Sequence, residues 1–352
     1  MPSLADYDLS TLEAEFIAAG HKPVHAARVL RRFYESSGQP DLNGISISNG
    51  VREHIARHLT ARRSRIIHHT VASDGTAKFL IGFDGGGAVE SVLMMGFRPG
   101  VAAGCVSSQI GCAMGCDFCA STRNGLERNL EAGEIVEQFL HLKERAAALG
   151  RRLKTVVFMG MGEPLLNFDA VAAAVRRIAD PNLRGIGWRH ITVSTVGIVP
   201  GIDRLAETDL NVNLAVSLHA PDDATRSRLV PMNRRYSVGE VVAATTRYQA
   251  QTGRIPTIEY CMLAGVNDSD RQAMLLADLL QNFTAHVNLI PYNSIGRSIT
   301  GFSYARPPLD RMERFIALLR ERGVVAHFRH TRGDDVNAAC GQLRETAMFP
   351  AA

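Results

Sequence analysis

The feature that most constrains the fold of this chain is a regular alternation of short β-rich runs and longer amphipathic stretches from Cys105 onward. We expect strands at residues 105–109, 155–159, 190–194, 211–218, 257–263, 286–291 and 324–329. Helices fit between them, at residues 132–148, 168–179, 238–252, 268–283 and 309–322. Because strands that alternate with helices pair in parallel, this pattern predicts an α/β fold with a parallel sheet, either open or curled into a barrel.

Polar and unusual residues follow four of these strands at their carboxyl ends. The four segments are Gly160–Pro164, Ser194–Gly197, Ser217–Ala220 and Pro291–Asn293. The active sites of parallel α/β barrels lie at that edge of the sheet. If the sheet curls, the four segments therefore converge on one site.

The first 95 residues have a different pattern. We expect helices up to residue 70, the first with a capping box at Ser10 and Glu13, the second beginning at Pro23 and the third near residues 51–59. Residues 71–95 predict a β-hairpin, and residues 96–104 read as a linker. We therefore expect an accessory domain of helices and a hairpin at residues 1–95, followed by a core domain at 96–352.

Composition excludes several classes of protein. The chain has 352 residues, 46% hydrophobic and 21% charged, which is ordinary for a globular protein and unlike a disordered chain, a collagen or a small disulfide scaffold. It has no apolar run of about 18 residues, and its acidic N-terminus is unlike a signal peptide, so we expect a soluble cytoplasmic protein without a membrane partner. The net charge of +4 comes mostly from arginine. Arginine permits an RNA or nucleotide partner, but a compositional bias explains it equally well.

Three of the six cysteines fall in one short window, Cys112-Ala-Met-Gly-Cys116-Asp-Phe-Cys119. Such crowding indicates a metal or cluster site. Two C-x2-C pairs would suggest structural zinc, whereas this spacing and the aromatic Phe118 are typical of the radical S-adenosylmethionine (SAM) superfamily. Three thiolates there bind a [4Fe–4S] cluster and leave the fourth iron open. The alternative is a zinc knuckle that borrows a fourth ligand such as Cys105.

Five motifs occur in order along the chain. They are Cys105–Cys119, Met159–Asn167, Ser217–Pro221, Asn288–Asn293 and Thr331–Leu343. With them the chain resembles the RlmN/Cfr family of radical SAM adenine methyltransferases from about residue 70 to residue 343. The resemblance implies a partial (β/α)6 barrel preceded by a small helical and hairpin domain.

The resemblance also implies roles for individual residues. Cluster ligands match at Cys112, Cys116 and Cys119, and SAM-binding positions match at Gly162, Glu163, Ser194, Ser217, Leu218, His219 and Asn293. Cys340 matches a cysteine that family members methylate, Cys105 its transient disulfide partner and Glu90 a proposed general base. Cys261 matches no family position, so we expect it in the core. Outside these motifs, Ser194 and Asn293 would read as turn or cap residues, Cys340 as a buried thiol, and Glu90 as the polar face of a half-buried strand.

The implied chemistry follows from the substrate. Adenine C2 or C8 has no lone pair that could attack a methylsulfonium, whereas a thiolate has one. In the implied mechanism one SAM methylates Cys340, and a second is cleaved to a 5′-deoxyadenosyl radical that takes a hydrogen from the S-methyl group. The methylene radical then adds to adenine, a base removes the ring proton, and Cys105 attacks the sulfur of Cys340 to free the product. An electron-donating protein must supply the reductant.

The substrates implied are C2 of adenine-2503 in 23S rRNA and of adenine-37 in tRNA for RlmN-like members. Cfr-like members methylate C8 of the same rRNA adenine and give antibiotic resistance. Residues 331–335 and 290–293 look more like the C2 enzymes. Residues 294–304 and 123–128 depart from the family pattern and leave the substrate open, because loops beside a site set its specificity.

The alternatives to C2 methylation are a C8 methyltransferase and a paralogue that acts on another RNA. A different class would be a non-catalytic iron–sulfur RNA-binding protein. In each enzymatic case the target base must leave its stack, and the N-terminal helices with nearby arginines are candidates for holding the RNA backbone.

Overall fold

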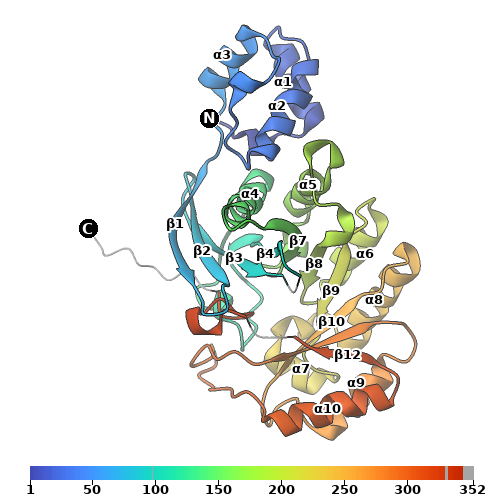
Figure 1. Cartoon of the computed structure of the whole chain (residues 1–352). Coiled ribbons are helices and arrows are strands. Elements are labelled where there is room, and N and C mark those ends of the chain that lie inside the picture. Colours follow the sequence, from blue (N-terminus) through green and yellow to red (C-terminus); the bar gives the residue numbers. More distant parts are fainter. Residues whose placement is uncertain (97, 330–331, 344–352) are drawn as a thin grey trace.

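The computed structural model of the chain describes residues 1–96, 98–329 and 332–343, so Thr331 of the last motif lies outside the described residues. Ten strands form one sheet in the order β1-β2-β3-β4-β7-β8-β9-β10-β11-β12 (Figure 1). Their bounds are β1 Ser64–Val71, β2 Ala77–Phe83, β3 Ala88–Met95, β4 Val101–Cys105, β7 Arg152–Phe158, β8 Ile191–Thr195, β9 Asn213–Ser217, β10 Thr257–Met262, β11 His286–Pro291 and β12 Val325–Phe328. The strands β5 (Gln109–Gly111) and β6 (Leu126–Asn129) form a separate antiparallel pair.

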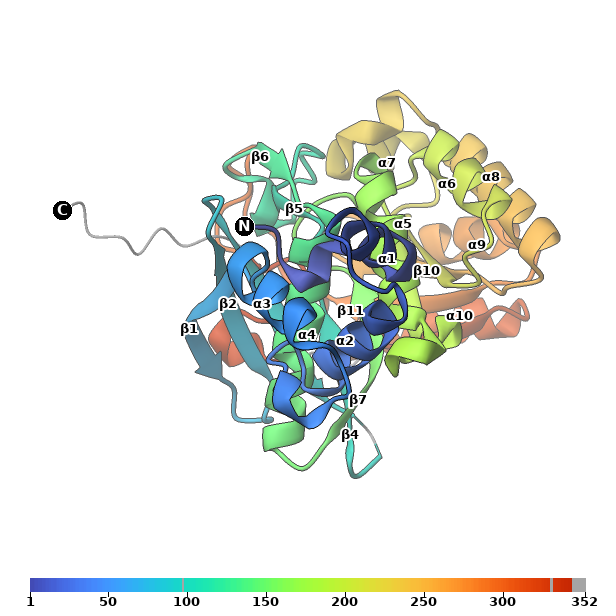
Figure 2. The same cartoon turned by 90° about the horizontal axis from the view of Figure 1, so that it is seen from above.

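From β4 to β12 all neighbouring strands are parallel. The helices between them are α4 Ala132–Ala148, α5 Phe168–Ala179, α6 Val199–Glu207, α7 Asp223–Leu229, α8 Val238–Thr252, α9 Asp270–Leu279 and α10 Leu309–Glu321. Helices α5 to α10 form an arc along one side of the strands (Figure 2). One cavity is lined by residues at or just after the carboxyl ends of β7 to β12, so the sheet curls around it. The predicted α/β fold with a partial barrel is confirmed.

The N-terminal helices are α1 (Leu9–Ala18), α2 (Val24–Glu35) and α3 (Asn49–His58). The N-cap of α1 is Asp8, whose carboxylate accepts from the backbone N–H of Thr11 and the hydroxyl of Ser10. The capping box expected at Ser10 and Glu13 is therefore wrong. The charged side chain of Asp8 occupies the cap position two residues earlier, which places Ser10 inside the first turn.

Two strand predictions are also wrong. Residues 64–71 form strand β1 instead of continuing the helical region, and they pair with β2 from Ser64 opposite Phe83. The strand expected at 105–109 is split: β4 begins at Val101, within the expected linker, and ends at Cys105. Strand β1 is defined by pairing with its neighbour β2, and β4 by pairing with β3 and with the distant β7, which local propensity does not record.

The hairpin strands β2 and β3 belong to the same sheet as the barrel. Strand β3 pairs with β4 antiparallel, with Val92 opposite Cys105. The sheet thus runs without a break from the hairpin into the barrel, and the domain boundary near residue 95 stays a proposal. Among the described residues, no helix is long and apolar enough to cross a membrane.

The C-terminal segment 332–343 packs against the turn between β1 and β2 (Figure 1). Asp74 of this turn accepts from the backbone N–H of Gly333, and Asp335 accepts from that of Ser73. Lys78 of β2 donates to the carbonyl of Asn337 at 3.1 Å. The hairpin therefore holds the segment that carries Cys340 against the open side of the barrel.

Candidate active site

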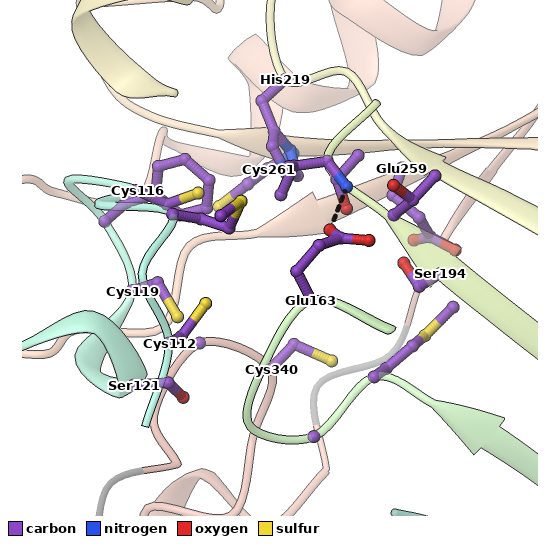
Figure 3. A pocket seen from close by; sticks show the side chains of 18 of the residues that line it. Cys112, Cys116, Cys119, Ser121, Glu163, Ser194, His219, Glu259, Cys261 and Cys340 are labelled. Atoms are coloured by element: carbon purple, nitrogen blue, oxygen red, sulfur yellow. Dashed lines mark hydrogen bonds between the residues drawn. The ribbon is translucent and has the colours of Figure 1, made fainter. Parts of the chain in front are cut away.

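A cavity of about 150 Å³ lies at the carboxyl ends of the parallel strands. Cys112, Cys116 and Cys119 line it together with Cys340. Figure 3 shows these four cysteines and Glu163 arranged around one space. The structure thus brings together residues from three sequence motifs that lie far apart in the chain.

The loop 112–119 carries the three clustered cysteines and is fixed from outside. The backbone N–H of Cys112 donates to the carbonyl of Gly125 at 2.8 Å. The carboxylate of Asp117 accepts from Tyr304 at 2.6 Å and from the hydroxyl of Thr300 at 2.8 Å. These contacts turn Asp117 outward while its cysteine neighbours face the cavity.

Burial dominates the electrostatics of these thiols. It raises the pKa of Cys112 to about 12, raises that of Cys116 well above its usual value and raises that of Cys119. Without a bound metal the three thiols are protonated at neutral pH, and metal binding must displace their protons. The donor set is soft, as iron–sulfur chemistry requires.

The arrangement of the three cysteines in space favours an iron–sulfur cluster over a single zinc ion. In the part of the chain that the structure describes, no three His, Cys, Asp or Glu side chains are placed to share a single metal ion. Cys105, the expected fourth zinc ligand, does not line the cavity. A four-iron cluster fits better, because each thiolate then binds a different iron.

Glu163 follows β7 and is held beside the cysteines by Gly162. Gly162 has φ +100°, and a Cβ there would lie 2.6–2.8 Å from atoms of Gln109, so only glycine fits. The carboxylate of Glu163 accepts from the backbone N–H groups of Val196 at 2.8 Å and Leu165 at 3.0 Å. Burial raises its pKa to about 7. A buried carboxylate of this kind suits a bound ammonium group.

Of the other predicted cofactor residues, Ser194, Ser217 and His219 line the cavity. His219 has φ +61°, and its Nδ1 accepts from the backbone N–H of Cys261 at 3.0 Å. Burial lowers the pKa of His219 to about 3, so the ring is neutral. Its ring also meets Phe118 edge-on, with centroids 4.7 Å apart. His219 thus packs against the loop that carries the clustered cysteines.

Two predicted cofactor residues do not line this cavity. Leu218 is fully buried, and its carbonyl accepts from Arg226 Nε at 2.9 Å. Asn293 lines a second cavity and donates to the carbonyl of Cys340 at 3.3 Å. Leu218 is therefore buried away from this cavity, whereas Asn293 lies beside the segment that carries Cys340.

The second cavity has a volume of about 560 Å³ and extends from the amino ends of β4 and β7 to the carboxyl ends of β11 and β12. Val101 of β4 and Lys154 of β7, both near the amino ends of their strands, line it. Arg98 and Arg332 add further positive charge to its wall. Cys340 lines both cavities, so its thiol lies where the two meet.

Cys105 is buried at the end of β4, and burial, with a smaller contribution from the nearby Cys340 thiol, raises its pKa to about 12. Glu90 is buried in β3 and lines neither cavity. Its carboxylate pairs with Lys78 Nζ at 2.9 Å, and Lys78 also contacts the Cys340 segment at Asn337. Glu90 is thus linked through Lys78 to the segment that carries Cys340.

Sequence reasoning missed several cavity residues. Cys261, expected in the core, is buried in β10 but also lines the first cavity. Arg329 lines both cavities, and its Nη1 lies 3.4 Å from Glu259 Oε2 and 3.3 Å from Met159 Sδ. The charges of Cys340 and Glu259 raise the pKa of Arg329. In the sequence these residues are marked only by their position on predicted strands. A strand position alone does not show whether a side chain points into the barrel or away from it.

Comparison with known proteins identifies relatives over nearly the whole chain. Residues 106–277 match the family model of the radical SAM superfamily. The probable dual-specificity RNA methyltransferase RlmN 1 of Opitutus terrae is 51% identical over 343 residues, 97% of each chain. The dual-specificity RNA methyltransferase RlmN of Alkalilimnicola ehrlichii is 40% identical and covers 97% of this chain and 93% of its own.

A solved structure gives the same picture. The crystal structure of a radical SAM methyltransferase from Sphaerobacter thermophilus is 42% identical to this chain. It covers 97% of this chain and 99% of its own, with a TM-score of 0.91. The resemblance therefore includes the N-terminal helices as well as the barrel.

Proposed function

This chain belongs to the RlmN family of radical SAM RNA methyltransferases, and from that premise we propose that it methylates C2 of adenine in 23S rRNA and tRNA through Cys340. The observation that carries the proposal is the position of Cys340 at the junction of two cavities. One cavity holds the clustered cysteines and the other has a basic wall. A methyl carrier needs such a position, because it must meet both its methyl donor and the RNA base.

The first cavity would hold the cofactors. Cys112, Cys116 and Cys119 would bind a [4Fe–4S] cluster, and Glu163 with the strand-end residues would bind the amino and ribose groups of SAM. When bound, the cluster and SAM together supply a radical that removes a hydrogen atom from a methyl group. The buried Glu163 carboxylate would neutralise the ammonium group of SAM.

Cys340 would accept the methyl group as a thiolate. Its sulfur lone pair forms the new S–C bond while the S–CH3 bond of SAM breaks, which releases S-adenosylhomocysteine. Arg329 lines both of the cavities that Cys340 lines, so a guanidinium lies in the walls that surround this sulfur. A second SAM would then be needed for the radical step, so we propose two molecules of SAM per turnover.

Release of the product would use Cys105. Its thiolate attacks the sulfur of Cys340, and the bond from that sulfur to the former methyl carbon breaks with its electron pair on the carbon. The carbon takes up a proton to become the methyl group of the product, and a disulfide joins the two cysteines. Because burial raises the pKa of Cys105 to about 12, the attack requires a group that removes its proton. Glu90 as the base that removes the adenine ring proton rests on the family resemblance, and its link through Lys78 to the segment that carries Cys340 supports it.

The substrate would reach Cys340 through the second cavity. Arg98, Lys154 and Arg332 would meet the RNA backbone, and the adenine would leave its stack to enter. The curated relatives are named for dual specificity toward RNA, which supports both rRNA and tRNA as substrates. Such substrates place the enzyme in the cytoplasm, where an electron-donating protein would reduce the cluster.

The test is a product assay with the cluster rebuilt without oxygen. The enzyme, SAM, dithionite and unmethylated 23S rRNA or tRNA are incubated, and the RNA is digested for nucleoside mass spectrometry. We expect 2-methyladenosine, its loss in Cys340→Ala, and its persistence in the control Cys261→Ala, which changes another cavity cysteine. Formation of 8-methyladenosine would assign the C8 reaction instead, and 5′-deoxyadenosine without either product would reject both RNA sites.

A further inference from the structure

The two segments that depart from the family pattern lie against each other beside the cysteine loop. Arg123 donates from Nη2 to the carbonyls of Ile295 and Arg297, the latter at 2.6 Å. The second segment reaches the loop through Thr300 and Tyr304, which both donate to Asp117. The unusual residues 123–128 and 294–304 therefore form one continuous structure on the outer side of the loop.

A third segment, residues 228–235, completes this surface. Its Leu229 carbonyl accepts from the backbone N–H of Asp117 at 2.9 Å. A Cβ placed on Gly115 would lie 3.5 Å from Pro231, which is ordinary van der Waals contact. We call the exposed arginines and large apolar residues of these three segments the cluster-loop face: Arg123, Leu126, Arg228, Arg234, Arg235, Arg297, Ile299 and Phe302.

The cluster-loop face is basic. Its five arginines are exposed, and in the part of the chain that the structure describes none of them has an acidic partner within ion-pair distance. The nearest loop carboxylate, Asp117, is buried and bonded to Thr300 and Tyr304. Asp223 of the neighbouring helix α7 accepts hydrogen bonds from Asn233 and Val238. Two exposed acidic side chains, Glu127 and Asp223, lie in or beside these segments, and the five arginines outnumber them.

Two arginines of the outer barrel helices, in contrast, have acidic partners. Arg247 pairs with Asp203 at 2.8 Å, and Arg322 pairs with Asp278 at 2.6 Å. Three large apolar side chains also lie on the cluster-loop face: Leu126, Ile299 and Phe302 are 40%, 50% and 55% exposed. Exposed apolar side chains among unpaired arginines suit a small, transient contact with an acidic protein, which the charges steer and the apolar groups complete.

The position of this face indicates what the partner does. The clustered cysteines are buried or nearly so beneath the loop, while Ala113 between Cys112 and Met114 is exposed. An electron donor must approach the cluster, and this loop is where its ligands come next to an exposed residue. We propose that the cluster-loop face docks an acidic one-electron carrier protein that reduces the cluster; this inference rests on the proposed function.

RNA is the other polyanion that a basic face could bind. The second cavity, however, gives RNA its own basic approach to Cys340 from the amino ends of β4 and β7. No residue of the cluster-loop face lines that cavity, because the face is built on segments that follow the carboxyl ends of β4, β9 and β11. The two partners can therefore approach from different sides, and the test must distinguish them.

The test uses the variant Arg228→Glu/Arg234→Glu/Arg297→Glu of the holoenzyme. The matched control, Arg145→Glu/Arg189→Glu/Arg271→Glu, makes the same charge change at exposed arginines elsewhere. SAM cleavage to 5′-deoxyadenosine is measured with reduced flavodoxin, an acidic one-electron carrier, or with dithionite. We expect the KM for flavodoxin to rise at least tenfold in the variant and less than twofold in the control, with dithionite-driven cleavage unchanged in both.

Equal KM values for flavodoxin in the variant and the control would overturn the proposal. So would a variant that keeps its flavodoxin KM but binds tRNA at least tenfold more weakly, because the face would then serve RNA. Loss of dithionite-driven cleavage with the iron content intact would also overturn it, since the substitutions would have damaged the cofactor site. Since SAM cleavage is the readout, failure of the proposed RNA reaction would show separately, as absence of 2-methyladenosine.

Discussion

At the scale of single residues, Arg226 organises the cavity without belonging to any sequence motif. It is fully buried in α7, and it donates to the carbonyls of Leu218 at 2.9 Å and Ser217 at 3.2 Å. It also donates to the carbonyl of Val196, so it joins the ends of β8 and β9. Burial lowers its pKa to about 10, which leaves it charged at neutral pH. A buried charge that satisfies several carbonyls is costly to remove.

We therefore predict that Arg226→Met lowers the free energy of unfolding by about 3 kcal/mol, because it leaves buried carbonyls unpaired. The affinity for SAM should fall with it, since the strand ends that carry Ser194 and Ser217 lose their tie. Urea unfolding and calorimetric SAM titration measure both effects. Arg228→Met is the matched control, because Arg228 lies on the same helix but is exposed. Equal unfolding free energies for the two variants would contradict the prediction.

How far a residue can be predicted from sequence depends on whether its role is local. Cys112, Cys116 and Cys119 lie in one loop, so their spacing alone indicates a shared ligand. Glu259 and Arg329 lie 70 positions apart and meet only because β10 and β12 both face the cavity. The contact between these two residues therefore cannot be predicted from their spacing in the sequence.

At the scale of elements, the cysteine loop depends on close packing between β5 and β6. Gly111 has φ +72°, and a Cβ there would collide with the carbonyl oxygen of Gly125. Gly125 has nearly the same backbone, φ +69°, but open space around its own Cβ position. An alanine at Gly125 would therefore meet backbone strain alone, whereas an alanine at Gly111 would meet the same strain and a steric collision.

We predict that Gly125→Ala costs about 1 kcal/mol of stability, from the left-handed backbone alone. Gly111→Ala adds a collision and should cost about 2–4 kcal/mol. Because Cys112 follows Gly111 directly, the iron bound after reconstitution should fall in Gly111→Ala and not in Gly125→Ala. Iron analysis and denaturant unfolding of both proteins check this, and equal iron content would show that the loop tolerates the collision.

The segment from the end of α3 to the start of β1 contacts α4 through a neutral histidine. Arg62 donates to His141 Nδ1 at 2.9 Å, and Ser64 Oγ lies 3.0 Å from His141 Nε2. A proton on Nδ1 would face the Arg62 guanidinium. Burial, followed by the charge of Arg62, lowers the pKa of His141 to about 3.

The sign of the pH effect follows from this lowered pKa. The unfolded chain binds a proton at His141 below about pH 6.5 and the folded chain does not, so acid favours unfolding. Between pH 7.5 and pH 5.5 wild type should lose about 1.4 kcal/mol of stability through this group, a loss that His141→Gln should not show. Denaturant unfolding at both pH values measures the difference, with the exposed His286→Gln as control. A pH dependence that is the same in all three proteins would assign the effect elsewhere.

Elements with strong amphipathic character could be predicted closely, because the helices at 132–148, 168–179 and 238–252 have the bounds that their periodicity indicates. Strand β1 could not, because most of its side chains are exposed and the strand exists only through pairing with β2. Strand β4 consists mostly of alanine and glycine between Val101 and Cys105. Its short side chains give no strand signal, although it is the first strand of the barrel.

At the scale of the whole molecule, the fold gives the chain two approaches to one thiol. The residues proposed to bind the cofactors lie at the carboxyl ends of the strands, and Cys340 lines both their cavity and the basic second cavity. A radical enzyme gains from this separation, because the electron donor and the large RNA need not compete for one surface. Sequence motifs identified the residues of the first cavity, but only the curled sheet reveals the second.

The separation predicts opposite effects of two sets of substitutions. Arg98→Glu/Lys154→Glu changes the wall of the second cavity, so tRNA affinity should fall at least tenfold. The slope of log affinity against log salt concentration should also become flatter, by about 1 for each phosphate that the variant no longer neutralises. Flavodoxin-driven SAM cleavage should be unchanged in this variant. The cluster-loop variant Arg228→Glu/Arg234→Glu/Arg297→Glu should show the reverse, with normal tRNA binding and impaired use of flavodoxin. If either variant impaired both partners equally, RNA and electron donor would share one surface and the two-sided arrangement would be wrong.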